Sequence, residues 1–331
     1  MFKYVLLITL ALVLPLTACS APTAVGPIPV EKIRLPMGYI PNVQFTPFYV
    51  AVDRGYFQEQ GIEIEFDYRF ETDGMKLVAA NELPFSIQSG EQVPLAREQG
   101  LPVIYVAQWW QHFPVVVVAL AESGISSPAD LEGKTIGTPL FGGASYIGWK
   151  ALVSRAGLDE STMRVLEIGY TQLAALTQGT VDAAICYINN EPIQLARAGR
   201  AIHIIEVSPF ANLVSNGLVT NESTIAQRPE LVEAMVTALL HGLRDTIADP
   251  DAAFEIAKKY VEGLGTDPET DAAQRQVLAA SIELWQADEP GLSSAADWET
   301  TLAVLREAGL LKIDMAAEDV FTNYFVEKAT E

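Results

Sequence analysis

The sequence predicts an α/β fold of two lobes that are joined by crossover segments. Strand and helix patterns alternate along most of the chain, the alternation falls into two blocks, and a segment of the first block recurs in the second. With 331 residues, half of them apolar, the chain is long enough for two folded units. Repeated strand–helix units predict mostly parallel sheets that are covered by helices.

The first block alternates between short apolar strands and amphipathic helices. Strand patterns cover residues 33–39, 62–67, 85–87, 103–107 and 115–120. Helix patterns cover residues 47–55, 73–80 and 91–99. The first strand leads into a polar loop at residues 40–42, and glycines end two of the helices.

The second block follows residue 123 with the same alternation. Helix patterns cover residues 128–131, 145–156 and 171–178, and strand patterns cover residues 134–138, 165–169 and 181–187. The chain is mostly helical from residue 222 onward. We therefore expect a first lobe of residues 31–118 plus 219–331 and a second lobe of residues 119–218. The crossovers are expected near residues 118–122 and 208–218.

A helix segment of the first block recurs 100 residues later. Glu, Leu, Ala and Arg stand at positions 91, 95, 96 and 97 and again at positions 191, 195, 196 and 197. Both segments follow a strand pattern and a polar loop, and such loops bind ligands in α/β sheets. The repeat therefore favours two related lobes whose loops face one ligand. A chance match between two helices rich in Ala, Leu and Arg is the alternative.

The charge and cysteine content exclude several classes of protein. The chain carries 21 basic and 42 acidic residues, a net charge of −21, which argues against a nucleic-acid partner. Its two cysteines are Cys19 and Cys186. Since we expect Cys19 to be lipidated, as described next, we expect neither an intrachain disulfide nor a zinc site built on cysteine pairs.

The N-terminus has the pattern of a lipoprotein leader. Lys3 precedes an apolar run over residues 4–16, and Leu-Thr-Ala-Cys at 16–19 resembles a bacterial lipobox. We expect residues 1–18 to be a signal peptide, Cys19 to be lipidated, and residues 19–30 to form a linker. The protein would then be anchored on the extracytoplasmic face of the cell membrane. An ordinary secretory signal with a chance cysteine is the alternative.

Catalytic and metal-binding patterns are missing from the sequence. The histidines His112, His203 and His241 do not have the spacing of metal ligands, and nucleophile-elbow, Walker A and dinucleotide motifs are absent. Cys186 lies in an apolar strand and is interpreted as a core residue. The glycine turn before Ser145 opens a helix whose N–H groups could hold a ligand atom. We predict a protein that is not an enzyme.

Aromatic and amide side chains gather where the predicted strands end. Rings of Trp and Tyr stack on flat ligands, and amides both donate and accept hydrogen bonds, which suits a neutral heterocycle. The alternative is that about half of these rings fill the core. The candidate ligand-binding residues are Tyr39, Asn42, Gln44, Phe45, Ser89, Glu91, Trp109, Trp110, Ser145, Tyr146, Tyr187, Asn190 and Glu191.

Several segments resemble solute-binding proteins of the thiamine-pyrimidine-synthase-like family. The resemblance rests on GYIPNVQF at 38–45, FYVA at 48–51, RGYFQEQGI at 54–62, DLEGKTIG at 130–137 and QGTVDA at 178–183. It implies a bilobal fold of the periplasmic-binding-protein type with a hinged cleft. It also implies a monomeric binding subunit that delivers a small molecule to an ABC permease and its ATPase.

The resemblance implies a vitamin or vitamin precursor as the ligand. Some members of the family bind pyrimidine precursors of thiamine, and a subset resembles riboflavin-binding subunits. The aromatic residues Trp109, Trp110, Tyr146 and Trp149 favour the larger ring of riboflavin, carried as cargo without any resident cofactor. Fungal relatives are pyrimidine synthases with a cysteine-rich run. This chain has no cysteine at 208–217, so the enzyme reading is the lesser alternative.

Overall fold

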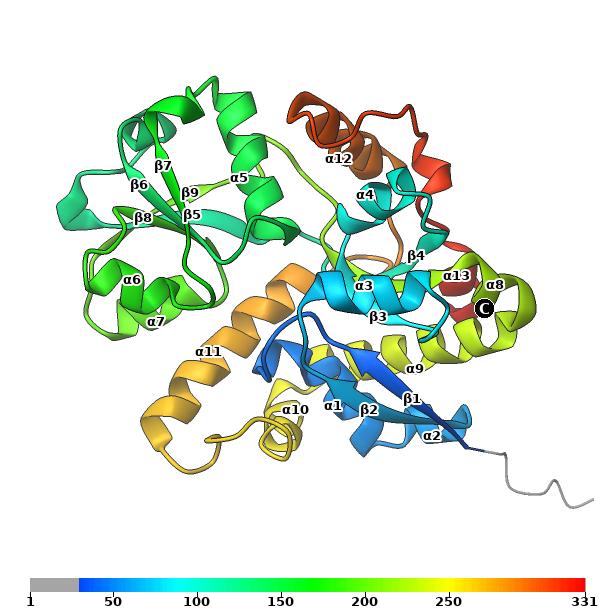
Figure 1. Cartoon of the computed structure of the whole chain (residues 1–331). Coiled ribbons are helices and arrows are strands. Elements are labelled where there is room, and N and C mark those ends of the chain that lie inside the picture. Colours follow the sequence, from blue (N-terminus) through cyan, green and yellow to red (C-terminus); the bar gives the residue numbers. More distant parts are fainter. Residues whose placement is uncertain (1–29, 331) are drawn as a thin grey trace, which may run out of the picture.

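The structure is a computed structural model that describes residues 30–330. The predicted signal peptide, the lipidated Cys19 and nearly all of the predicted linker lie outside these residues. Two lobes are visible, one drawn mainly in green and the other built from both ends of the described chain (Figure 1).

The first lobe contains strands from both ends of the described chain. They are β1 (Glu31–Pro36), β2 (Ile62–Asp67), β3 (Ser86–Ser89), β4 (Val103–Gln108) and β10 (Asn216–Asn221). The N-terminal helices are α1 (Thr46–Asp53), α2 (Tyr56–Glu59), α3 (Glu71–Ala79) and α4 (Gln92–Glu98). The C-terminal helices are α8 (Glu222–Gln227), α9 (Pro229–Ala248), α10 (Pro250–Ala257), α11 (Pro268–Trp285), α12 (Ala295–Glu307) and α13 (Tyr324–Thr330).

The second lobe is a continuous stretch of chain. Its strands are β5 (Val115–Leu120), β6 (Thr135–Thr138), β7 (Arg164–Glu167), β8 (Ala183–Tyr187) and β9 (Ile202–Glu206). Its helices are α5 (Gly143–Ala156), α6 (Gln172–Thr177) and α7 (Glu191–Arg197). The segment predicted as a helix at 128–131 is a single 3₁₀ turn.

The structure has one parallel, one antiparallel and one mixed sheet among its described residues, whereas the sequence predicted mostly parallel sheets. In the first lobe β1 pairs with β2 in parallel, and β10 runs antiparallel between β3 and β4. The second lobe has the strand order β7-β6-β8-β5-β9, in which β6 is parallel to both neighbours and β5 is antiparallel to both. The two strands that run antiparallel to both of their neighbours are β5 and β10, and each is the first strand after a crossover.

The crossovers differ from the predicted positions. Because β5 pairs with β8 and β9, residues 115–118 belong to the second lobe, and the first crossover is 109–114. The second crossover is 207–215, since β10 already pairs with β3 and β4. Every residue of β5 is buried and apolar, so its sequence could not show which sheet it joins.

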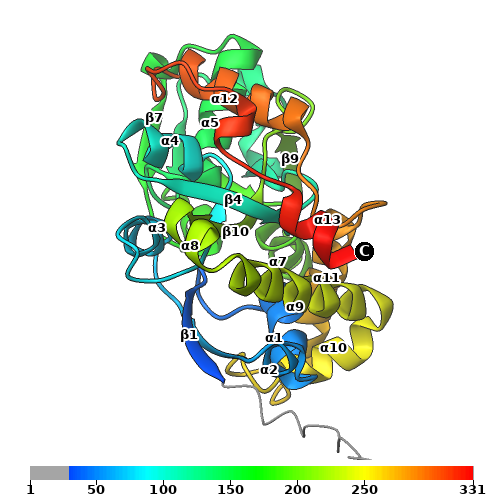
Figure 2. The same cartoon turned by 90° about the vertical axis from the view of Figure 1, so that its right-hand side faces the viewer.

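Helix α9 forms much of the core of the first lobe, and Figure 2 shows it running beside α1 and α13. Pro229 occupies its first turn, and Leu231, Met235 and Leu239 recur at helical spacing on its buried face. A Cβ atom at Gly242 would lie 2.1 Å from the carbonyl oxygen of Pro47. The close approach of α9 to α1 therefore requires glycine at position 242. This contact fixes the position of α1 and so of the loop that precedes it.

Helix α12 comes from the C-terminal segment but packs against α5 of the second lobe. Arg155 on α5 forms an ion pair of 2.9 Å with Glu307. Thr301 accepts a hydrogen bond of 2.9 Å from the backbone N–H of Val214, which lies in the second crossover. Helix α12 thus connects the second lobe to a crossover.

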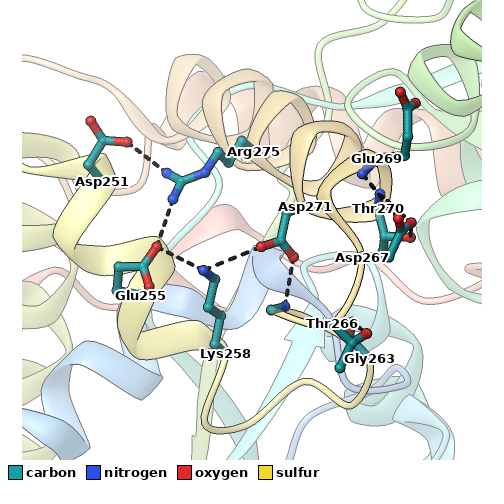
Figure 3. A network of polar contacts seen from close by, with 11 residues as sticks. Asp251, Glu255, Lys258, Gly263, Thr266, Asp267, Glu269, Thr270, Asp271 and Arg275 are labelled. Carbon is teal, nitrogen blue, oxygen red and sulfur yellow. Dashed lines mark hydrogen bonds and ion pairs between the residues drawn. The ribbon is translucent and has the colours of Figure 1, made fainter.

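Helix α11 contacts the second lobe through α7. The Asn189 side chain donates a hydrogen bond of 2.8 Å to Ser281, and Arg197 pairs with Glu269 at 3.2 Å. A network of ion pairs and capping bonds orients the start of α11 (Figure 3). In it, Arg275 pairs with Asp251 and Glu255, Lys258 pairs with Glu255 and Asp271, and Asp267 caps the helix.

No helix within residues 30–330 combines the length and apolar character that crossing a membrane requires.

Replacing Thr301 with Val should lower the free energy of unfolding by about 1–3 kcal/mol, because it leaves the buried N–H of Val214 without a partner. Urea denaturation followed by tryptophan fluorescence measures the change. Thr300→Val is the matched control, since Thr300 is on the same helix and bonds only to the carbonyl of Ala296. Equal midpoints for the two variants would contradict the proposed role of Thr301.

Candidate ligand-binding site

A cavity of about 100 Å³ lies between the two lobes, and both lobes supply its wall. Most of the lining residues stand directly after a strand, which is where α/β folds bind ligands. Residues 37–39 follow β1, Phe70 and Glu71 follow β2, Trp109 and Trp110 follow β4, and residues 139–140 and 142–145 follow β6. Tyr170 follows β7 and Tyr187 ends β8.

Aromatic rings make up much of the wall. The rings that line the cavity are Tyr39, Phe45, Phe70, Trp109, Trp110, Tyr170 and Tyr187. They come from both lobes and surround the space with apolar surfaces suited to a flat ligand.

The two tryptophans are embedded in a cluster of aromatic side chains. The Trp109 ring lies 5.6 Å from Phe45 and 5.7 Å from Trp285, between ring centroids. The Trp110 ring lies 5.6 Å from that of Tyr187. Both indoles are almost fully buried, so they present only part of their surface to the cavity. Their packing makes this part of the wall rigid.

Aromatic contacts also join the lobes across the cavity. Tyr170 of the second lobe lies between two rings of the first lobe. Its centroid is 4.6 Å from that of Tyr39, edge to face, and 5.9 Å from that of Phe70, nearly parallel. The phenol of Tyr187 donates a hydrogen bond of 3.0 Å to Asn216 at the start of β10. The lobes are therefore in direct contact around the cavity.

Glu71 lines the cavity from the first lobe. Its carboxylate accepts hydrogen bonds from the backbone N–H of Ser89 at 3.1 Å, from the Ser89 hydroxyl, and from the Asn216 amide at 3.0 Å. Burial nevertheless raises the pKa of Glu71 to about 7.

Glu191 lines the cavity from the second lobe. Its carboxylate accepts hydrogen bonds from the Asn190 amide at 3.0 Å and from the backbone N–H of Tyr187 at 3.3 Å. The side chain is buried, and this raises its pKa to about 7. Asn190 also bonds to Gln194 at 2.8 Å, which holds its amide in place.

The described residues of the wall supply carboxyl and amide groups but no cationic side chain. Its polar side chains are Gln44, Glu71, Thr72, Ser145, Gln172, Asn190, Glu191 and Asn216. None of the described residues that form the wall is Lys, Arg or His. Within residues 30–330 no group of His, Cys, Asp or Glu is arranged to hold a metal ion. The cavity thus disfavours an anionic ligand and suits one that is rich in hydrogen-bond donors.

The structure brings nine of the thirteen predicted site residues to the cavity wall. They are Tyr39, Gln44, Phe45, Trp109, Trp110, Ser145, Tyr187, Asn190 and Glu191.

Asn42, Ser89, Glu91 and Tyr146 do not line the cavity. Asn42 caps the turn before α1 by accepting a hydrogen bond from the N–H of Gln44. Ser89 donates hydrogen bonds to the Glu71 carboxylate from its backbone N–H and its hydroxyl. Glu91 is 1% exposed and bonds to its neighbour, while Tyr146 packs against an exposed ring on its own lobe. In these four residues the polar atom or ring is engaged by the protein.

Sequence reasoning missed Phe70, Glu71, Tyr170 and Asn216. Phe70, Glu71 and Tyr170 follow strands that the sequence did predict. The rule that α/β folds bind ligands beyond the carboxyl ends of strands could therefore have found them. Asn216 begins a strand that was not predicted, because it lies in the expected crossover. Its amide bonds to Glu71 and its oxygen accepts from Tyr187, so it links the two lobes.

Residues 42–253 match the family model described as NMT1/THI5 like. The chain belongs to this family. It is 38% identical to the riboflavin-binding protein RibY of Chloroflexus aurantiacus, over 97% of both chains. It is 29% identical to the formylaminopyrimidine-binding protein of Halalkalibacterium halodurans, over 94% of this chain and 96% of that one.

The solved structures show the same fold for this member of the NMT1/THI5-like family. One is the alkanesulfonate-binding protein SsuA of Xanthomonas axonopodis pv. citri, bound to MOPS. Its TM-score is 0.69 at 14% identity, and the match covers 89% of this chain and 99% of that one. The predicted α/β fold of the periplasmic-binding-protein type is confirmed. The relatives described above are named as binding proteins, whereas a relative from Legionella pneumophila, 25% identical over 68% of this chain and 72% of that one, is named as a 4-amino-5-hydroxymethyl-2-methylpyrimidine phosphate synthase.

The free energy of unfolding should fall between pH 5 and pH 8, with Glu91 as the largest single contributor. Burial and then the charge of Glu71 raise the pKa of Glu91 to about 8. Between the unfolded value of about 4.3 and this value, the folded state binds more protons than the unfolded state, so the free energy of unfolding decreases as pH rises. Glu71 and Glu191 act in the same direction up to about pH 7.

Glu91→Gln should reduce this pH-dependent loss by about 1–3 kcal/mol, because the neutral amide has no charge to bury. Chemical denaturation at pH 5 and pH 8 measures the difference. The exposed Glu132→Gln is the control. An unchanged pH profile in Glu91→Gln would show that Glu91 is not the main source.

Proposed function

We propose that the protein is the extracytoplasmic binding subunit of an ABC importer and that its ligand is riboflavin. The observation that carries the proposal is the cavity between the lobes, whose wall combines aromatic rings with amide and carboxyl groups and lacks cationic residues among those described. Such a wall stacks a flat ring and accepts hydrogen bonds from its N–H and O–H groups.

The polar chemistry of the wall disfavours an anionic cargo. A sulfonate or phosphate group is bound most strongly by cationic side chains, and the wall instead presents Glu71 and Glu191. This chain therefore shares its fold with a sulfonate-binding protein, but we do not expect it to share the sulfonate ligand.

Riboflavin is favoured over other uncharged rings by the number of aromatic residues in the wall and by the similarity of this chain to RibY. The seven aromatic residues of the wall offer more stacking surface than a single pyrimidine ring requires. A formylaminopyrimidine is the second candidate. Glu71 and Glu191 would accept hydrogen bonds from its amino groups, and the relative that binds it is 29% identical.

The remaining features of the proposal concern the setting of the protein. We propose that it is held by a lipid on Cys19, acts as a monomer, and passes its cargo to a membrane permease coupled to an ATPase. It would carry riboflavin as cargo, without a resident cofactor and without catalysis.

Titration of the purified protein with riboflavin should quench flavin fluorescence with a single saturable binding curve, because the ring becomes stacked between aromatic side chains. A preparation isolated from riboflavin-containing medium should be yellow. If riboflavin leaves fluorescence and thermal stability unchanged while a formylaminopyrimidine raises the melting temperature, the second candidate is correct.

Tyr187→Ala should weaken riboflavin binding about tenfold or more, since it removes a cavity ring and the bond to Asn216. Tyr324→Ala is the matched control, because Tyr324 is an exposed tyrosine of α13 that does not line the cavity. Isothermal titration calorimetry gives both dissociation constants. Equal affinities in the two variants would remove Tyr187 from the site.

A further inference from the structure

Glu71 is held in one orientation on the cavity wall. Two hydrogen bonds from Ser89 and one from Asn216 fix its carboxylate, and these partners come from β3 and β10 of the first lobe. Such a carboxylate offers further lone pairs to a ligand but cannot turn away from one.

The Glu71 carboxylate also lies against the N-terminus of α5, on the opposite lobe. Gly143, the first residue of this helix, has φ of 68°, and a Cβ atom there would lie 3.4 Å from Oε2 of Glu71. The N-terminus of a helix attracts anions. Here the protein places its own carboxylate beside it, so an anionic group of a ligand at this helix end would lie next to Glu71.

Glu191 places a second carboxyl group on the same cavity from the other lobe. It is 7% exposed and is held by Asn190 and by the backbone of Tyr187. No described residue of the wall is cationic, so neither carboxyl group has a cationic partner there, and both are mostly ionised only above about pH 7. Above that pH, an anionic ligand would meet like charges from both lobes in a partly desolvated space.

We propose that Glu71 and Glu191 form a charge filter, which admits the uncharged vitamin and rejects anionic derivatives of the same ring. The inference rests on the proposed function, and the derivative that tests it is riboflavin 5′-phosphate. The phosphate ester keeps the ring and the sugar chain of riboflavin and adds a charge of about −1.5 to −2 at pH 7.

The mature wild-type protein is titrated at about pH 8.5, where both carboxyl groups are mostly ionised, with riboflavin, with riboflavin 5′-phosphate and with the neutral 5′-acetate ester. We expect riboflavin 5′-phosphate to bind about 100-fold more weakly than riboflavin, because its phosphate is repelled by the carboxylates of Glu71 and Glu191 in a partly desolvated space. The acetate ester, which has a similar added bulk but no charge, should bind within about fivefold of riboflavin.

The variants Glu71→Gln and Glu191→Gln test whether these two groups cause the discrimination. Each should reduce the ratio of the two dissociation constants by about tenfold, because the amide keeps the shape and removes the charge. Glu132→Gln is the control, since Glu132 is exposed and precedes β6 at the end opposite the cavity. Thermal unfolding shows that each variant is folded before it is titrated.

Each outcome supports or overturns a specific statement. If riboflavin and its phosphate bind equally to the wild type, the charge filter is wrong and the proposed function stands. If the phosphate is rejected but the acetate ester is rejected as well, and neither Gln variant changes the ratio, the discrimination is steric and the filter is again wrong. If no flavin binds to the folded protein, the proposed function fails and this inference fails with it.

Discussion

Two carboxyl groups, one from each lobe, face a single cavity whose described wall residues include no cation. Burial of Glu71 and Glu191 disfavours the charged form of each carboxyl group, because that form loses its hydration, and this raises both pKa values to about 7. The surrounding structure offsets this cost with donors from Ser89, Asn216, Asn190 and the backbone. A ligand with N–H or O–H groups would add further donors, so the unliganded cavity already defines the chemistry that it accepts.

The same residues connect the ligand site to the contact between the lobes. Asn216 bonds to Glu71 in its own lobe and to Tyr187 of the other, and it stands where the second crossover becomes β10. Asn189, next to the cavity residue Asn190, bonds to Ser281 of α11. A ligand that favours this arrangement would therefore shift the lobes toward it, because a ligand moves a conformational equilibrium only through its differential affinity.

The order of strands and helices could be predicted from periodicity, and most of the wall could be predicted from the rule that ligands lie beyond strand ends. Sheet membership could not. The fully apolar β5 fits either lobe, and β10 lies in a segment that was expected to be a crossover. Glu71 was missed because it opens an amphipathic helix, where an acidic residue is ordinary. Only its tertiary partners, Ser89 and Asn216, distinguish it from a surface glutamate.

A crystal structure of the protein grown with riboflavin tests the account most directly. The account predicts that the ring system occupies the cavity between the lobes, against Tyr or Trp side chains, with donor atoms of the ligand within hydrogen-bond distance of Glu71 or Glu191. A flavin bound elsewhere, or a ligand in the cavity that presents an anionic group to these carboxylates, would contradict it.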